Sequence, residues 1–201
     1  MAELRSALPS FSANRNIRLL YVATIVAGTL PFLPIWIVYL TDLRGLTLVQ
    51  IGLMESFFWG VAIVMEVPTG AFSDRFGRRP TLLIGYGVQA VGVLVFALAG
   101  SFPLLLVSYA IWSMGIAFGS GTIEAYLYEA LAAEGREDEF PVTMGRQTGF
   151  SLLATTFGVI GGAALAGAIS LRAPIFLAVA TFLAAMPLVA LMQEPPRARR
   201  A

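Results

Sequence analysis

The amino-acid sequence predicts an all-α, polytopic membrane protein. Of its 201 residues, 58% are hydrophobic and only 12% are charged, whereas soluble domains carry about 25% charged residues. The mean hydropathy is +0.81, and apolar runs recur between short polar breaks. Because a soluble fold cannot bury so much apolar surface, we expect this chain to have lipid as its main solvent.

Six apolar runs are each long enough to cross a bilayer as a helix. The breaks between them carry turn chemistry: a Gly-containing turn near residue 45, a charged loop over 73–79, a Gly-Ser-Phe-Pro turn over 100–103, and an acidic stretch over 134–139. The last break, 170–174, is so short that we expect a tight helical hairpin there. The predicted spans are 17–40, 48–72, 80–100, 103–127, 145–168 and 172–192.

The arginines set the expected orientation. All 13 basic residues are arginine, and with the N-terminus inside, only Arg44 and Arg172 fall on the outer side. Cytoplasmic loops carry the excess of basic residues in membrane proteins, so we predict that both termini are cytoplasmic. This gives a cytoplasmic N-terminal segment over 1–16, a transmembrane domain over 17–192 and a basic cytoplasmic tail over 193–201.

The residue types that are absent exclude several classes of chemistry. The chain contains no cysteine and no histidine, so it has no disulfide or thiolate site, and any proton transfer must use carboxylates or tyrosines. It also lacks a phosphate-binding Gly-x-x-x-x-Gly-Lys loop and a credible metal cluster. We therefore predict that it is not an enzyme, holds no metal or cofactor, and does not bind nucleic acid, since membrane topology explains its arginines.

A charged, glycine-bounded segment over 70–79 is the most specific motif. Its acid, Asp74, is expected just past the end of the second span, where a helix C-terminus disfavours negative charge and a cation is needed. An ordinary cytoplasmic loop would explain the arginines, but not the spacing of glycine, aspartate and glycine. The residues of this motif are Gly70, Asp74, Arg75, Gly77, Arg78 and Arg79.

This motif, Gly-x-x-x-Asp-Arg-x-Gly-Arg-Arg, resembles the signature loop of the major facilitator superfamily. The six-span layout is similar to the N-terminal half of that family over nearly the whole chain. The resemblance implies a three-plus-three inverted repeat, although the amino-acid sequence shows no visible internal symmetry. It also implies that Asp74 latches this half to a second half on the cytoplasmic side, that the three arginines form its charge network, and that Gly70 and Gly77 permit close packing and a turn.

Several carboxylates fall inside or at the ends of the predicted spans. A charge at the centre of a bilayer costs about 3 kcal/mol or more, so such a residue usually faces a partner or a wet cavity. Glu66 precedes Pro68, where the helix can bend, and a structural pair with a cytoplasmic arginine is an equal alternative for it. The candidates for a proton or charge relay are Glu66, Glu124, Glu129 and Arg146.

Further polar and aromatic residues are candidates for lining a cavity, although each alone is more often a packing or hydrogen-bonding residue. They are Thr24, Thr29, Glu55, Trp112, Gln147 and Ser151. The fifth span carries Gly149, Gly158 and Gly162, whose spacing resembles the antiporter motif of the family's drug exporters. Val159 stands where that motif has proline, so helix packing is the safer interpretation of these glycines.

The resemblance implies a secondary active transporter that alternates access to a small molecule. We expect efflux, with proton coupling as an option, while the arginine typical of proton-coupled exporters is missing from the fourth span. Uptake of a sugar or metabolite is one alternative, and a non-transporting partner or an inert half is another. The expected partners are the lipid bilayer, a small-molecule substrate, protons, and a second six-helix half from another copy or a longer protein. The expected location is a bacterial cytoplasmic membrane.

Overall fold

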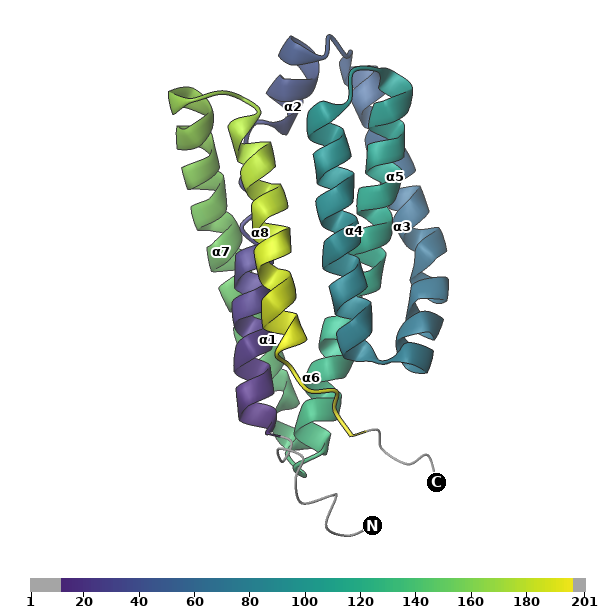
Figure 1. Cartoon of the computed structure of the whole chain (residues 1–201), viewed down its shortest axis with the longest axis vertical. Helices are drawn as coiled ribbons and strands as arrows, with labels where there is room; N and C mark the ends of the chain where they lie inside the picture. The colour runs from purple at the N-terminus through teal and green to yellow at the C-terminus, as the bar shows by residue number, and fades with distance from the viewer. Residues whose placement is uncertain (1–11, 197–201) are drawn as a thin grey trace.

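A computed structural model describes residues 12–196 of the chain. Every regular element in that range is helical, which confirms the all-α prediction for the described residues. Residues 1–11 and 197–201, which belong to the two predicted cytoplasmic segments, lie outside the described range. The elements are α1 (Ala13–Ala27), α2 (Trp36–Val38), the π-helix η2 (Tyr39–Leu43), α3 (Leu48–Phe76), α4 (Arg78–Leu98), α5 (Phe102–Gly119), α6 (Thr122–Ala132), the 3-10 turn η3 (Glu137–Glu139), α7 (Phe140–Ala168) and α8 (Ala173–Ala190) (Figure 1).

Five helical stretches of residues 12–196 are long and apolar enough to cross a membrane. They correspond to the second to sixth predicted spans, so the chain is a multi-pass membrane protein. Their bounds are Leu48–Phe76, Arg78–Leu98, Phe102–Ala132, Glu137–Ala168 and Ala173–Ala190.

The first predicted span is not one continuous helix, so the expectation of a helix over 17–40 is wrong in this respect. α1 ends at Ala27, residues 28–35 form turns, and the helix resumes only in α2 and η2. Pro31 and Pro34 explain the break, because proline has no N–H and disfavours helical geometry in the residue before it. Leu30 has a φ of 38°, a value that L residues rarely adopt.

Two other helices differ from their predicted bounds. The fourth span is divided at Ser120 and Gly121, where Gly121 takes a φ of +68° before α6 begins. The fifth begins at Phe140 rather than near 145. Pro141 is in the first turn of this helix, where its missing N–H removes no helical hydrogen bond.

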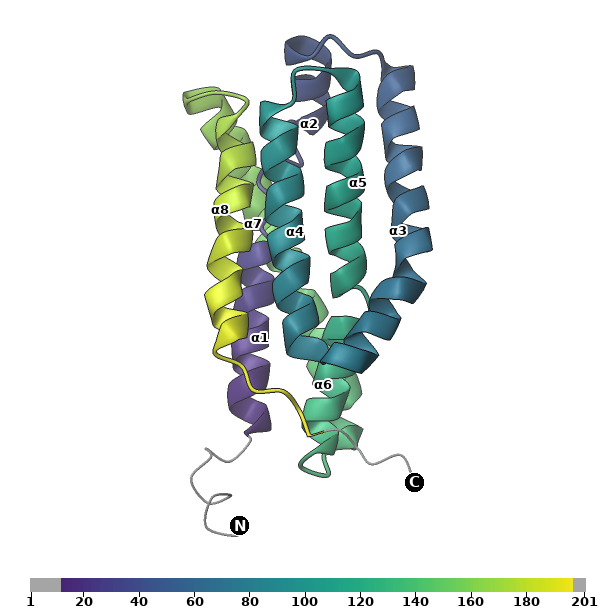
Figure 2. The same ribbon diagram turned by 45° about the vertical axis from the view of Figure 1, so that its right-hand side comes forward.

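The helices form two groups. α3, α4 and α5 lie side by side in one group, and α1, α7 and α8 form the other (Figure 2). α4 packs on both α5 and α8, and so joins the groups. The core of the bundle contains Leu82, Tyr109 and Phe182, each at most 2% exposed. Close packing of such large side chains stabilises the bundle through van der Waals contacts.

The outward faces of α3 and α7 remain apolar and exposed in the isolated chain. Val64 and Val67 on α3 are 71% and 79% exposed, and Phe157 on α7 is 70% exposed. An apolar surface of this extent requires lipid or another protein against it.

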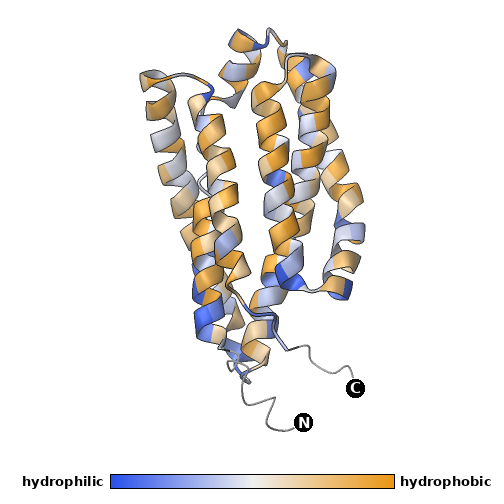
Figure 3. Cartoon of the chain, viewed as in Figure 1, coloured by the Kyte–Doolittle hydropathy of each residue, from blue (hydrophilic) through white to orange (hydrophobic). Residues whose placement is uncertain are grey.

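The described ends of the chain lie together at one end of the bundle, called here the terminal end; the other end is called the distal end. The Arg15 guanidinium donates to the Leu191 carbonyl at 3.4 Å, and the Gln193 N–H donates to the Asn16 side chain at 2.8 Å. Hydrophilic residues gather at this terminal end (Figure 3). The described chain therefore enters and leaves the bundle on the same side.

Candidate functional site

The charged motif lies at the terminal end, where α3 turns into α4. The predicted loop over 73–79 is wrong: α3 continues through Asp74 and Arg75 to Phe76, and α4 begins at Arg78. Only Gly77 separates the two helices, and its φ of +107° is a conformation that favours glycine. Ser73 and Asp74, although common in turns, remain helical here, and Gly77 alone makes the turn.

Arg78 is the centre of the charged junction. Its guanidinium lies 2.8 Å from Asp74 in the last turn of α3, four residues earlier, and 2.8 Å from Glu129 on α6. It also donates to the Ser73 hydroxyl at 2.9 Å. The Arg78 side chain is only 16% exposed, so these charge-assisted bonds replace most of its hydration. The junction thus fixes α6 against the turn between α3 and α4.

The segment after α8 also contacts the charged junction. The Glu194 carboxylate accepts from the backbone N–H groups of Arg78 at 2.5 Å and Arg79 at 2.9 Å. These are first-turn N–H groups of α4, which have no partner within the helix and carry partial positive charge. The Arg79 side chain in turn donates to the carbonyls of Val189 and Ala190 at the end of α8. Glu194, which follows α8, thus bonds to the start of α4, and Arg79 of α4 bonds to the end of α8. The two contacts together hold α4 against the end of α8.

Glu194→Ala should lower the free energy of unfolding by about 1 kcal/mol, which is typical for the loss of a helix-capping side chain. The effect should appear as a lower midpoint in denaturant titrations of the detergent-solubilised chain, followed by circular dichroism. Glu137→Ala, an exposed acid at the same end, is the matched control. Equal midpoints for the two variants would contradict a capping role for Glu194.

A second charged cluster lies at the start of α1, at the terminal end. The Glu134 carboxylate accepts from the Ala13 N–H at 2.9 Å and pairs with Arg136 at 2.9 Å. The hydrogen bond from Ala13, and then the one from Arg136, lower the pKa of Glu134 below its ordinary value. The carboxylate therefore stays charged where it caps the start of α1.

The structure separates the residues proposed as a charge relay. Glu129 is paired with Arg78, whereas Glu66 lies near the Ser120 hydroxyl at 3.5 Å. Glu124 is exposed in the first turn of α6, and no salt bridge among residues 12–196 joins it to Arg146. These side chains do not form one continuous chain of ion pairs in this conformation.

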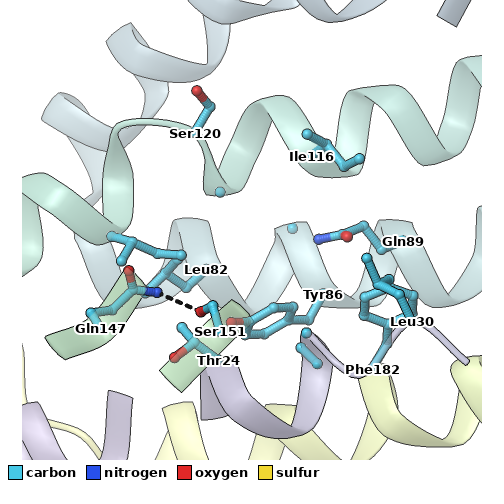
Figure 4. A pocket seen from close by; sticks show the side chains of 15 residues that line it. Thr24, Leu30, Leu82, Tyr86, Gln89, Ile116, Ser120, Gln147, Ser151 and Phe182 are labelled. Carbon is cyan, nitrogen blue, oxygen red and sulfur yellow. Dashed lines mark hydrogen bonds between the residues drawn. The ribbon is translucent and has the colours of Figure 1, made fainter. Parts of the chain in front are cut away.

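A cavity of about 440 Å³ lies between the two groups of helices. It brings together three of the predicted cavity residues, Thr24, Gln147 and Ser151, and the Gln147 amide donates to the Ser151 hydroxyl at 3.1 Å (Figure 4). Its walls come from α1, α4, α5, α6, α7 and α8. We call this space the central cavity.

Sequence reasoning missed Ser120 as a cavity residue, and it missed two further polar residues of the central cavity, Tyr86 and Gln89 on α4. Figure 4 shows both side chains among those that line it. Their spacing of three residues places them on one face of a helix, and that pattern in an otherwise apolar span was the available signal. Within residues 12–196, no group of three or more acidic side chains converges into a metal-binding set.

Three predicted cavity residues lie elsewhere. Thr29 donates back to the Val26 carbonyl at 3.1 Å, within the break of the first span. Glu55 and Trp112 line a second, smaller cavity of about 210 Å³ together with several aromatic side chains. We call it the aromatic cavity.

The glycines of α7 have different surroundings. A Cβ built on Gly158 would lie 1.6 Å from the Thr29 carbonyl oxygen, and one on Gly162 would lie 1.7 Å from that of Pro31. Gly149 has no other atom within 4 Å of the same position, and the same holds for Gly70. Close packing therefore explains Gly158 and Gly162 but not Gly149 or Gly70 in this conformation.

Comparison with known proteins gives a match over residues 19–201 to the family described as Major Facilitator Superfamily. An uncharacterized transporter of this type from Bacillus subtilis is 29% identical over 133 residues, which cover 66% of this chain and 31% of that protein. The raffinose permease of Escherichia coli is 31% identical over 146 residues, 68% of this chain and 33% of the permease. A multidrug transporter of Candida glabrata is 34% identical over 109 residues, 52% of this chain and 17% of that protein. The matched stretch thus spans about a third or less of these relatives.

Proposed function

Because the chain belongs to the major facilitator superfamily of membrane transporters, we propose that it forms one six-span half of an alternating-access transporter for a small molecule. Members of this family rock two halves against each other around a site at the membrane midplane. The second half would come from another copy of this chain or from a longer protein. The two halves must share one orientation, which an even number of spans provides.

The observation that carries this proposal is the central cavity in a bundle of the matching family. Its volume of about 440 Å³ lies within the range of about 300–1,000 Å³ that is usual for small-molecule sites. Thr24, Gln89, Gln147 and Ser151 supply hydrogen-bonding groups in walls that are otherwise mainly apolar. Such a wall suits a small molecule with a few polar groups.

The position of the arginines supports a cytoplasmic terminal end. Arg15, Arg79 and Arg136 all bond to residues at that end, namely Leu191, Ala190 and Asn14. Arg44 instead follows η2 and donates to the Ala97 carbonyl near the end of α4, at the distal end. By the positive-inside rule, both termini are proposed to be cytoplasmic, in a bacterial cytoplasmic membrane.

Proton-driven efflux is the proposed direction, with Glu66 and Glu124 as the proton-carrying candidates. The name of the Candida glabrata relative, a multidrug transporter, supports efflux. Raffinose permease and an arabinose-proton symporter of Bacillus subtilis are also relatives, and these names favour sugar uptake as the second candidate.

Flux through lipid vesicles that contain the chain tests the proposal. An imposed pH gradient should drive ethidium accumulation, and Glu66→Gln and Glu124→Gln should reduce the gradient-dependent rate at least about tenfold if these acids carry the protons. Raffinose and arabinose flux in the same vesicles tests the uptake alternative. A chain that remains monomeric in lipid nanodiscs and moves none of these solutes would contradict autonomous transport and favour a non-transporting partner.

A further inference from the structure

The aromatic cavity is separate from the central cavity and is built around one carboxylate. It lies between the break that follows α1 and the helices α3, α4 and α5, which stand side by side in Figure 2. The chain has three tryptophans, and all three line it: Trp36, Trp59 and Trp112. Glu55 supplies the charge in this wall.

The rings of the wall hold one another in fixed orientations. Phe58 is at the centre, with ring centroids 4.9 Å from Trp112, 5.4 Å from Trp59 and 5.8 Å from Tyr109. The contacts with Trp59 and Tyr109 are edge-to-face, an arrangement that aromatic quadrupoles favour. Rings packed in this way present electron-rich faces without having to reorder when a ligand binds.

Glu55 has no cationic partner among the described residues. None of the salt bridges within residues 12–196 includes it, and its polar neighbour is the Tyr109 hydroxyl. Of the two arginines at the distal end, Arg44 is held by the Tyr39 hydroxyl and the Ala97 carbonyl, and Arg172 lies at the start of α8 in the other group of helices. A partly buried carboxylate among aromatic rings is costly unless a positive charge joins it.

A second polar group in the wall also lacks a partner. The indole Nε1 of Trp112 is buried and has no hydrogen-bond partner within the described residues. A buried donor without an acceptor is uncommon in folded proteins. Because this nitrogen has almost no accessible surface, it lies behind the wall of the cavity, and Glu55 is the charged residue that the wall presents to a ligand.

We propose that the aromatic cavity binds a small organic cation of the quaternary ammonium type. The Glu55 carboxylate neutralises the charge, and the faces of the surrounding tryptophan and tyrosine rings contact the alkyl groups, which carry the charge of such an ion. A cavity of about 210 Å³ is smaller than most sites for drug-sized ligands, so a compact ion fits better than a large dye.

Choline is the probe for this proposal, and 3,3-dimethylbutan-1-ol is the control because it has the same shape without the charge. Since all three tryptophans line the cavity, the intrinsic fluorescence of the detergent-solubilised chain reports directly on its occupancy. Choline chloride should give a saturable change at constant ionic strength, and the neutral alcohol should bind at least about tenfold more weakly, as expected when a cation–π and ionic contact is lost. Equal responses to the two ligands would overturn the proposal.

Two variants locate the site. Glu55→Gln keeps the shape and removes the charge, so it should weaken choline binding at least about tenfold. Asp42→Asn removes a charge from an exposed residue of η2 that does not line the cavity, and it should leave choline binding unchanged. Choline binding that survives Glu55→Gln, or that Asp42→Asn weakens equally, would overturn the assignment to this cavity.

The equilibrium titration does not depend on transport. The comparison of choline with its neutral analogue on the unaltered chain remains decisive even when a variant does not fold. Binding without flux would leave the aromatic cavity assigned and the transport proposal contradicted, whereas flux without selective choline binding would do the reverse.

Discussion

Alanine at Gly158 or at Gly162 should destabilise the bundle by about 3 kcal/mol or more, at the upper end of the range for overpacked cores. The added methyl carbon would lie 1.6 Å from the Thr29 oxygen or 1.7 Å from the Pro31 oxygen. Both obstacles are main-chain carbonyls, which cannot rotate away as a side chain can. α7 must therefore move off the broken first span, and it loses its contact there.

The same helix offers matched controls. Gly149 and Gly161 have no other atom within 4 Å of an ideal Cβ, so alanine there should be neutral or should stabilise the helix by about 0.5–1 kcal/mol. Denaturant titrations followed by circular dichroism in one detergent compare all four variants. If Gly158→Ala unfolds at the same midpoint as Gly161→Ala, the close approach of α7 to residues 29 and 31 does not hold in the protein.

Arg78→Gln should lower the free energy of unfolding by about 1.5–3 kcal/mol, the usual range for hydrogen bonds to charged groups. The substitution leaves Glu129, whose side chain is 25% exposed, without its cation. An uncompensated, partly buried carboxylate is costly. The double variant Arg78→Gln/Glu129→Gln should recover part of the loss, because it also removes the stranded charge.

Asp74 provides an internal comparison for this prediction. Its side chain is 60% exposed, so solvent screens its pair with Arg78 and the loss in Asp74→Asn should stay within about 1 kcal/mol. Denaturation midpoints of the three single variants and the double variant complete the cycle. Additive effects of Arg78→Gln and Glu129→Gln would show that the pair contributes nothing to stability.

Hydropathy predicted the bounds of the spans that form one continuous helix, but it did not predict where a span is interrupted. α4 and α8 agree with their predicted spans to within two residues at each end, because each is one apolar run between turn residues. In the first span, Pro31 and Pro34 signalled the break, but hydropathy alone joined α1 to η2. In the fourth span, Gly119, Ser120 and Gly121 are residues of turn-forming type at the break, but the hydropathy of the surrounding run stays high enough to join α5 to α6.

The candidate site was also predictable only in part. The local motif identified Asp74 and Arg78, which are four residues apart and pair across the turn at Gly77. The partners that complete the junction, Glu129 and Glu194, come from elements 51 and 116 residues away from Arg78. No local pattern encodes such a contact, because it depends on how the helices pack.

The break over 28–35 also constrains how this bundle can move. Its backbone is non-helical, and backbone groups without helical partners cannot be exposed to hydrocarbon at low cost. α7 covers the Thr29 and Pro31 carbonyls with Gly158 and Gly162, and the Thr155 hydroxyl donates to the Gly28 carbonyl at 2.7 Å. If α7 moved away, these main-chain carbonyls would be exposed to hydrocarbon. We therefore expect α1 and α7 to move together as one rigid unit during any rocking of the protein.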